Sequence, residues 1–218
     1  MLALAKEPHI KGFTTNPTLM KKAGITDYAT FAKEILAHIT KKPISFEVFS
    51  DDFDEMERQA RIINSWGENI YVKIPVTNTK AKSSAALVKK LSQEGIRLNV
   101  TALLTLAQVQ EMVSALSSKT PAIVSVFAGR IADTGQHPAA LMRAAKALMK
   151  KKPNIELLWA SQRELFNIYE AEDAGVDIIT VPHDILKKIK LIGYDHAQLS
   201  LETVMMFYDD GKKAGYQL

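Results

Sequence analysis

The sequence contains no cysteine, which excludes disulfide bonds and thiolate metal sites and fits a reducing compartment. It also lacks an apolar run near the roughly 20 residues that span a bilayer, and its first residues follow no signal-peptide pattern. No basic stripe interleaved with aromatic residues occurs, although such stripes are typical of proteins that bind nucleic acids. We therefore expect a cytoplasmic protein that binds neither membranes nor nucleic acids.

The residues that are present give a composition typical of a globular protein, with 47% hydrophobic and 24% charged residues in 218. The net charge is +4, and the clustered lysines fall where helices are predicted to end, at Lys41–Lys42, Lys150–Lys152 and Lys187–Lys190. Cations at these positions complement the helix dipole and solubilise exposed faces. The charge pattern leaves room for a small anionic substrate.

Short apolar or β-branched runs alternate with segments of helical period along the whole chain. The predicted strands are Gly12–Thr15, Ile44–Val48, Ile70–Pro75, Arg97–Thr101, Ala122–Phe127, Ile155–Ala160 and Asp177–Pro182. The predicted helices are Tyr28–Ile39, Phe53–Ser65, Ser83–Gln93, Leu106–Leu116, Ala139–Met149, Glu164–Ala174, Ile185–Lys190 and a C-terminal helix from about Ala197 to Tyr208. Strands separated by single helices indicate parallel βα units, and no linker divides residues 1–218, so we expect one domain.

The predicted fold is an α/β barrel of the (β/α)8 type whose first strand is missing from this chain. Seven strands can be counted, one short of a closed eight-stranded barrel, and Met1–Lys6 has a helical pattern. A barrel without one strand exposes two backbone edges. Either the natural chain is longer at its start by about a dozen residues, which we expect, or the protein is an unusual open sheet.

Lys73 is the most informative residue, because it lies within the apolar strand Ile70–Pro75. A buried lysine is rare, since the removal of an ammonium group from water costs several kcal/mol. Desolvation favours the neutral amine, which is a nucleophile toward carbonyl groups. The alternative is a lysine whose ammonium reaches solvent from an edge strand.

Polar residues occur at the carboxyl ends of successive predicted strands. They are Asn16, Glu47, Lys73, Asn99, Thr101, Ser125 and Ser161. Each has a simpler explanation, such as a turn residue for Asn16 or a small core residue for Thr101 and Ser125. Six strands in succession nevertheless bring a polar side chain to the same rim, where barrel enzymes carry their active sites.

These segments resemble the transaldolase family, specifically its branch of small transaldolases and fructose 6-phosphate aldolases. Gly12–Thr18 resembles the threonine-threonine-asparagine-proline signature, and Val72–Pro75 resembles the segment with the Schiff-base lysine. Asn99–Thr101, Ser125–Ile131 and Ala160–Arg163 match later motifs in order and spacing. The resemblance covers nearly the whole chain except its start.

The resemblance implies a metal-free and cofactor-free enzyme in which Lys73 forms an iminium with a ketose phosphate. Glu47 and Thr101 then correspond to the pair that holds a proton-relay water, and Asn16, Asn99 and Ser125 correspond to residues that bind substrate hydroxyls. The implied phosphate ligands are Arg130, Ser161 and Arg163, and arginine side chains suit phosphate oxygens. In the family, an aspartate at the end of the first strand acts as acid/base, and no residue of this sequence, Asp27, Asp51 and Asp133 included, occupies that position.

Two positions favour transfer over cleavage. The aldolase members carry glutamine where Glu47 stands and tyrosine where Phe127 stands. We therefore expect a transaldolase of the pentose phosphate pathway that moves a dihydroxyacetone unit from fructose 6-phosphate or sedoheptulose 7-phosphate to an aldose phosphate. The alternatives are a fructose 6-phosphate aldolase-like lyase and a non-catalytic chain that binds sugar phosphates without the acid/base aspartate.

The C-terminal helix is expected to mediate self-association. It carries the apolar residues Leu199, Leu201, Val204, Met205, Phe207 and Tyr208, more than one barrel-facing stripe requires. Small members of the family form rings, so the resemblance implies a homo-oligomer, either a pentamer or a decamer.

Overall fold

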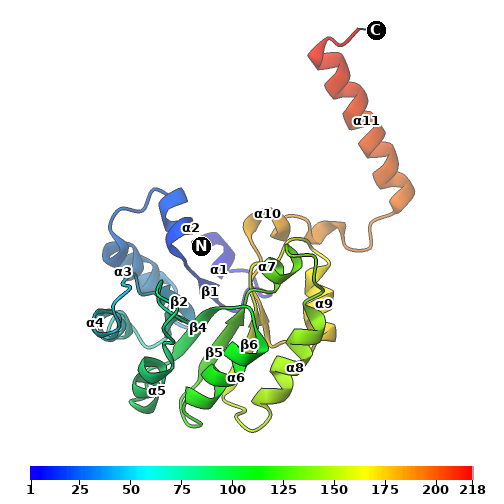
Figure 1. Ribbon diagram of the computed structural model, residues 1–218. Coiled ribbons are helices and arrows are strands. Elements are labelled where there is room, and N and C mark those ends of the chain that lie inside the picture. The colour runs from blue at the N-terminus through cyan, green and yellow to red at the C-terminus, as the bar shows by residue number, and fades with distance from the viewer. Residues whose placement is uncertain (218) are drawn as a thin grey trace. The chain divides into compact units, whose positions relative to one another are not determined.

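The computed structural model describes residues 1–217 and divides into two compact units, Met1–Thr180 and a second unit that begins at Val181. The first unit is a sheet of seven parallel strands in sequential order, curled into an open barrel (Figure 1). The strands are β1 (Phe13–Thr14), β2 (Ile44–Glu47), β3 (Ile70–Pro75), β4 (Leu98–Leu103), β5 (Ala122–Val126), β6 (Ile155–Trp159) and β7 (Ile178–Ile179). Each lies within or overlaps a predicted strand, and the α/β barrel-like fold is confirmed.

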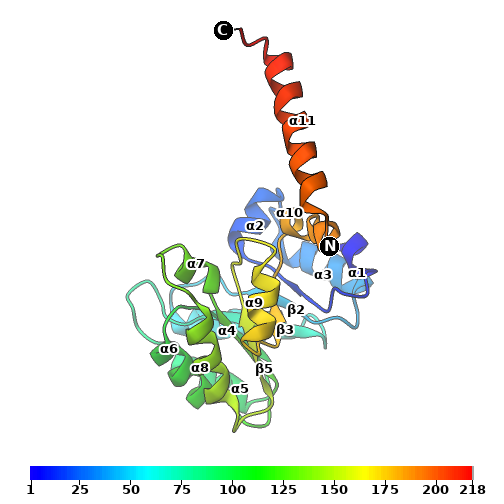
Figure 2. The same cartoon turned by 90° about the vertical axis from the view of Figure 1, so that its right-hand side faces the viewer.

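Helices cover the outer face of the curled sheet, as the two perpendicular views show (Figures 1 and 2). The longer ones are α3 (Tyr28–His38), α4 (Phe53–Asn64), α5 (Ala85–Gln93), α6 (Leu106–Ala115), α8 (Ala139–Met149) and α9 (Asn167–Asp173). Each lies between two successive strands in the chain, which is the right arrangement for parallel βα units. Local capping defines several starts: Asp27 caps α3, Asp52 caps α4, and Thr105 with Gln108 forms a capping box on α6.

Two short helices were not predicted, α2 (Pro17–Lys22) and α7 (Ala128–Ala132). Both follow directly on a strand and are too short to show a helical period in the sequence. A third short helix, α1 (Leu2–Ala5), confirms the helical pattern at the start. β7 is shorter than its predicted segment, because only Leu158↔Ile178 and Trp159↔Ile179 pair with β6.

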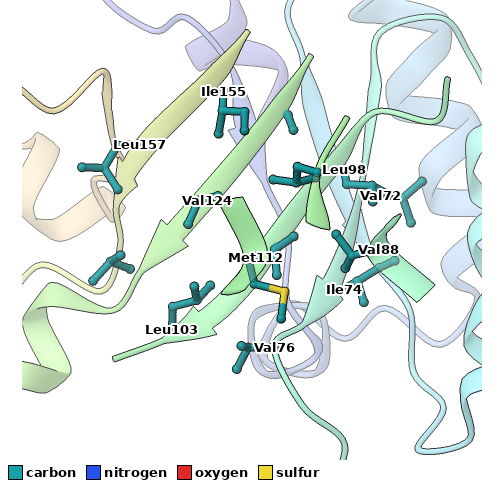
Figure 3. Close-up of a cluster of buried hydrophobic side chains, with 14 of the residues drawn as sticks. Val72, Ile74, Val76, Val88, Leu98, Leu103, Met112, Val124, Ile155 and Leu157 are labelled. Atoms are coloured by element: carbon teal, nitrogen blue, oxygen red, sulfur yellow. The ribbon is translucent and has the colours of Figure 1, made fainter. Parts of the chain in front are cut away.

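The main core lies between the sheet and the outer helices (Figure 3). Val72 and Ile74 of β3 belong to it, together with Val88 of α5 and Met112 of α6. A smaller inner cluster on the other face of the sheet contains Tyr71, Ile123, Leu158 and Ala160. Because side chains alternate along a strand, Lys73 faces the inside of the barrel with Tyr71.

The second unit contains α10 (His183–Leu186), a 3-10 helix (Ile189–Leu191) and α11 (His196–Ala214). α11 begins at its Asp195 cap and ends at Gly215, whose φ of 69° suits a helix C-terminus. The helix therefore runs past the predicted end at Tyr208, through Gly211, with Lys212 and Lys213 favourably placed in the last turn. No helix within residues 1–217 has the length and apolar character to cross a membrane.

Candidate active site

Lys73 is buried, with 6% of its surface exposed, and its ammonium group has two acceptors. Nζ lies 2.9 Å from Oε2 of Glu47 and 2.8 Å from the carbonyl oxygen of Thr15. The three residues come from neighbouring strands or their ends, since β2 and β3 place Glu47 directly beside Lys73. A buried cation is tolerated when it is paired and hydrogen-bonded in this way. The alternative, a lysine whose ammonium group reaches solvent from an edge strand, is therefore wrong.

Glu47 ends β2, and its side chain is 16% exposed. Its carboxylate pairs with Lys73, and its backbone N–H donates to the hydroxyl of Tyr28 over 2.9 Å. Burial raises the pKa of Tyr28, and the negative charge of Glu47 adds to the shift. Tyr28 therefore remains a neutral hydroxyl beside the ion pair.

A buried chain of hydrogen bonds crosses the inside of the barrel next to Lys73. Asn99 pairs in register with Lys73, donates from Nδ2 to Oγ of Ser45 over 3.0 Å, and accepts from Oγ of Ser125 over 2.6 Å. The three residues belong to β4, β2 and β5 and are 3% exposed or less. Because each partner sits on a strand, the amide of Asn99 is held in one orientation.

Thr101 is buried in β4, opposite Pro75, and lies within the irregularity between Val100 and Leu103 in the pairing of β4 with β5. The next residue, Ala102, has a φ of 66°, which is unusual for a residue other than glycine. Bulges of this kind occur next to active sites, where they redirect the chain. Thr101 therefore lies on the same rim as Lys73.

Asn16 lies at the end of β1 and serves as the cap of α2. Its Oδ1 accepts from the backbone N–H of Leu19 over 2.8 Å, with Pro17 at the first helical position. The structure thus shows Asn16 as the cap of α2, and its role in binding a substrate hydroxyl stays a prediction.

The expected phosphate ligands follow β5 and β6. The two connections pack tightly: a Cβ on Gly129 would lie 1.5 Å from the carbonyl oxygen of Ser161, so only glycine fits. Ser161 itself has a left-handed backbone, with a φ of 63°. This contact places the backbone of Ser161 beside Gly129, which precedes Arg130 in α7.

Both arginines of this group are exposed. The guanidinium of Arg163 forms an ion pair with Asp133, and that hydrogen-bonded pairing holds the pKa of the Asp133 carboxyl below its usual value. The guanidinium of Arg130 lies over the ring of Phe127, 5.2 Å from its centre. The charge of Arg130 also contributes to the lowered pKa of Asp133, so both guanidinium groups lie near this carboxylate.

Four residues of the site were missed in the sequence: Thr15, Tyr28, Ser45 and Asp133. Thr15 stands inside the motif that contains Asn16, but its contribution is a backbone carbonyl, which no residue type reveals. Ser45 could have been found from the sequence, because side chains alternate along a strand and Ser45 stands two residues before Glu47, on the same inward face. Tyr28 and Asp133 carry no local signal, because their partners lie 19 and 30 residues away.

The lysine end of the site has the chemistry of a carbonyl-reactive amine with an adjacent proton acceptor. Within residues 1–217, no group of three or more histidine, aspartate or glutamate side chains is arranged to hold a metal ion. The residues next to Lys73 are instead amide, hydroxyl and carboxylate groups, which suit a polyhydroxylated substrate.

The model of the transaldolase/fructose-6-phosphate aldolase family matches residues 1–217. The chain belongs to this family. A probable transaldolase of Thermoplasma volcanium is 35% identical over 207 residues, which cover 94% of this chain and 86% of that protein. A probable transaldolase of Dehalococcoides mccartyi is 34% identical over 181 residues, which cover 83% of this chain and 80% of that protein. A third, from Caldicellulosiruptor saccharolyticus, is 37% identical over 183 residues, which cover 83% of this chain and 79% of that protein. Membership indicates an enzyme of this kind that acts on sugar phosphates.

Proposed function

We propose that this chain is a transaldolase that transfers a dihydroxyacetone unit from fructose 6-phosphate or sedoheptulose 7-phosphate to an aldose phosphate. The pentose phosphate pathway is the setting in which such a reaction belongs. The observation that carries the proposal is the buried Lys73 amine, held between the Glu47 carboxylate and the Thr15 carbonyl.

The first step is addition of the Lys73 amine to C2 of the ketose. Nζ must lose a proton before it attacks, and the carboxylate at 2.9 Å is the nearest acceptor with a negative charge. The resulting carbinolamine loses water and becomes an iminium. A water molecule between Glu47 and Thr101 would carry protons to and from the substrate oxygen in these steps.

Cleavage follows from the positive charge of the iminium. The C3–C4 bond breaks, its electron pair forms the C2–C3 double bond of an enamine, and the proton of the C4 hydroxyl passes to the proposed relay water as the aldose forms. The three-carbon enamine stays on Lys73 until it attacks the carbonyl carbon of an acceptor aldose. Asn99, Ser125 and Asn16 are proposed to bind the hydroxyl groups of the donor, and the buried Asn99–Ser125 hydrogen bond supports a fixed orientation.

The phosphate group is proposed to bind to Arg130, Ser161 and Arg163. Arg163 already binds an anionic group, the carboxylate of Asp133, in an exposed position. A substrate phosphate offers the same guanidinium more acceptor oxygens and more charge. We therefore infer that phosphate binding displaces or shares the Asp133 contact.

Trapping of the covalent intermediate tests the proposal. Incubation with fructose 6-phosphate followed by borohydride is expected to fix a three-carbon adduct on Lys73, detected by peptide mass mapping. Lys73→Met removes the amine while it keeps an apolar side chain of similar length, so trapping is expected to disappear. Lys82→Met, at an exposed lysine of the same chain region, is the matched control and should trap normally. An adduct on Lys80, Lys82 or Lys89 would contradict the assignment.

We also propose that the chain is a homo-oligomer, either a pentamer or a decamer. None of the described residues of α11 is buried, and Val204, Met205 and Phe207 are at least 56% exposed. A helix with this much apolar surface is suited to a second copy of the chain. Light scattering at micromolar concentration is expected to give a mass of five or ten subunits; the mass of a monomer would contradict the proposal.

A further inference from the structure

Tyr28 lies outside the barrel sheet, in the first turn of α3, yet its hydroxyl is joined to both residues that hold Lys73. It accepts from the backbone N–H of Glu47 over 2.9 Å, and it lies 3.0 Å from Oγ1 of Thr15. Thr15 provides the carbonyl that accepts from Lys73, and Glu47 provides the carboxylate. No family motif in the sequence includes this tyrosine.

The hydroxyl of Tyr28 interrupts the ladder between β1 and β2. Phe13 and Thr15 donate to the carbonyls of Pro43 and Ser45, which is the regular pattern of a parallel pair. Continued by one step, that pattern would direct the Glu47 N–H to the Thr15 carbonyl. The N–H goes to Tyr28 instead, and the Thr15 carbonyl accepts from the Lys73 ammonium group.

The direction of each hydrogen bond in this group follows from the number of protons. Thr15 has one hydroxyl proton, which it donates to the carbonyl of Ser45 over 3.0 Å. The hydrogen bond between Tyr28 and Thr15 must therefore use the proton of Tyr28. The O–H of Tyr28 thus donates to Oγ1 of Thr15, and its oxygen accepts from the backbone N–H of Glu47. All three groups are satisfied only while Tyr28 is protonated, in accord with a pKa that burial raises.

Neighbouring aromatic rings hold the Tyr28 ring in place. Phe49, Phe46 and Trp66 meet it edge-on, with ring centres 4.6, 5.8 and 6.0 Å away. Such contacts fix the ring plane and with it the position of the hydroxyl. The hydroxyl is therefore a rigid part of the structure between the ends of two strands.

We propose that Tyr28 is a positioning residue: its hydroxyl accepts the hydrogen bond of the Glu47 N–H, so the Thr15 carbonyl is available to the catalytic amine. The inference rests on the proposed role of Lys73 as the Schiff-base residue. Tyr28 acts through its neighbours and does not touch the substrate. Without the Tyr28 hydroxyl, we expect the Glu47 N–H to donate to the Thr15 carbonyl, so that β1 and β2 gain one ladder hydrogen bond and the ammonium group of Lys73 competes with this N–H for the acceptor.

Tyr28→Phe tests this inference, because it removes one oxygen and keeps the ring. We expect the rate of borohydride trapping and kcat to fall roughly tenfold, which is the effect of one lost hydrogen bond, while KM for fructose 6-phosphate stays within about twofold. A crystal structure of the variant should show Glu47 N at about 3 Å from Thr15 O, with Nζ of Lys73 no longer bound there.

A matched control separates positioning from general stability. Tyr71→Phe removes the hydroxyl of a buried tyrosine in the same strand as Lys73, for which the structure gives no side-chain hydrogen bond within residues 1–217. This variant is expected to lower the melting temperature at most and to trap substrate at the wild-type rate.

The outcomes decide the inference separately from the proposed function. Wild-type trapping and kcat in Tyr28→Phe, or an unchanged Lys73–Thr15 contact in its crystal structure, would overturn it. Failure of the wild-type protein to form an adduct on Lys73 would overturn the proposed function, and the crystal structure would still decide the ladder change. Should Tyr28→Phe not fold, Thr15→Val replaces it: loss of the acceptor for the Tyr28 proton should slow trapping a few-fold, and an unchanged rate would refute the role.

Discussion

The two ends of the candidate site are built differently. At the lysine end, Lys73, Asn99 and Ser125 are buried on strands, and each has a specific partner. At the proposed phosphate end, Arg130 and Arg163 are exposed and stand beyond the strands, on α7 and after β6. The difference fits the two proposed tasks: atoms that make bonds require fixed geometry, whereas a phosphate site requires exposed charge that can exchange one anion for another.

The electrostatics of the two ends differ in the same way. The Lys73–Glu47 pair is shielded from water, so loss of either partner leaves an uncompensated charge. The Arg163–Asp133 pair is open to solvent, where water and salt weaken it. Substitutions at the lysine end should therefore change rates strongly, and substitutions at the phosphate end should mainly change affinity.

The largest effect is expected at Glu47, where Glu47→Gln removes the charge and basicity and keeps the shape. General acid–base help of this type accounts for roughly 10²–10⁴ in rate, so transfer to erythrose 4-phosphate should fall by that factor. Steady-state kcat with fructose 6-phosphate as donor measures it, and trapping on Lys73 should remain detectable. Because aldolase members of the family carry glutamine here, addition of Phe127→Tyr should increase release of free dihydroxyacetone. A double variant with full transfer activity would assign both residues no part in the choice of reaction.

A smaller effect is expected at the phosphate end, from Arg130→Ala and Arg163→Ala. Each loses a charged hydrogen bond to phosphate, so KM should rise by roughly one to two decades with little change in kcat. Dihydroxyacetone, which has no phosphate, is the internal control: its trapping on Lys73 should be the same in variant and wild type. If KM for phosphorylated donors is the same as in the wild type in both variants, the two arginines have only a structural role.

The smallest effect is expected from Asp133→Asn, which removes the anion that competes for Arg163. KM for phosphorylated donors should fall a few-fold, since exposed ion pairs are weak. The Arg163 guanidinium holds the pKa of Asp133 below 3.8, so the pair persists above that value and is lost only as pH falls through the lowered pKa. The gain in affinity should consequently be constant between about pH 6 and 9. A higher KM in the variant would mean that Asp133 orients Arg163 for phosphate.

The sequence alone determined the sequential parallel strands and the rim on which the polar residues gather. β3 and α8 have the predicted bounds, because an apolar run or a helical period is a local property of the chain. Lys73 could be singled out for the same reason, since a charge within an apolar strand is visible without any partner. The position of Glu47 and Asn99 at strand ends, together with the resemblance to the family, indicated these two neighbours as well.

Only the tertiary structure decided how these residues are joined. Asn99 binds Ser45 across 54 residues of sequence, Tyr28 enters the β1–β2 ladder from a helix, and Arg163 finds Asp133. The period of a segment reports which face is buried, and it carries no information on which distant group meets that face. A hydrogen bond also depends on tenths of an ångström, and a backbone acceptor such as the Thr15 carbonyl is the same for every residue type. The contacts that orient the amine of Lys73 therefore arise from the packing of strands and helices far apart in the chain.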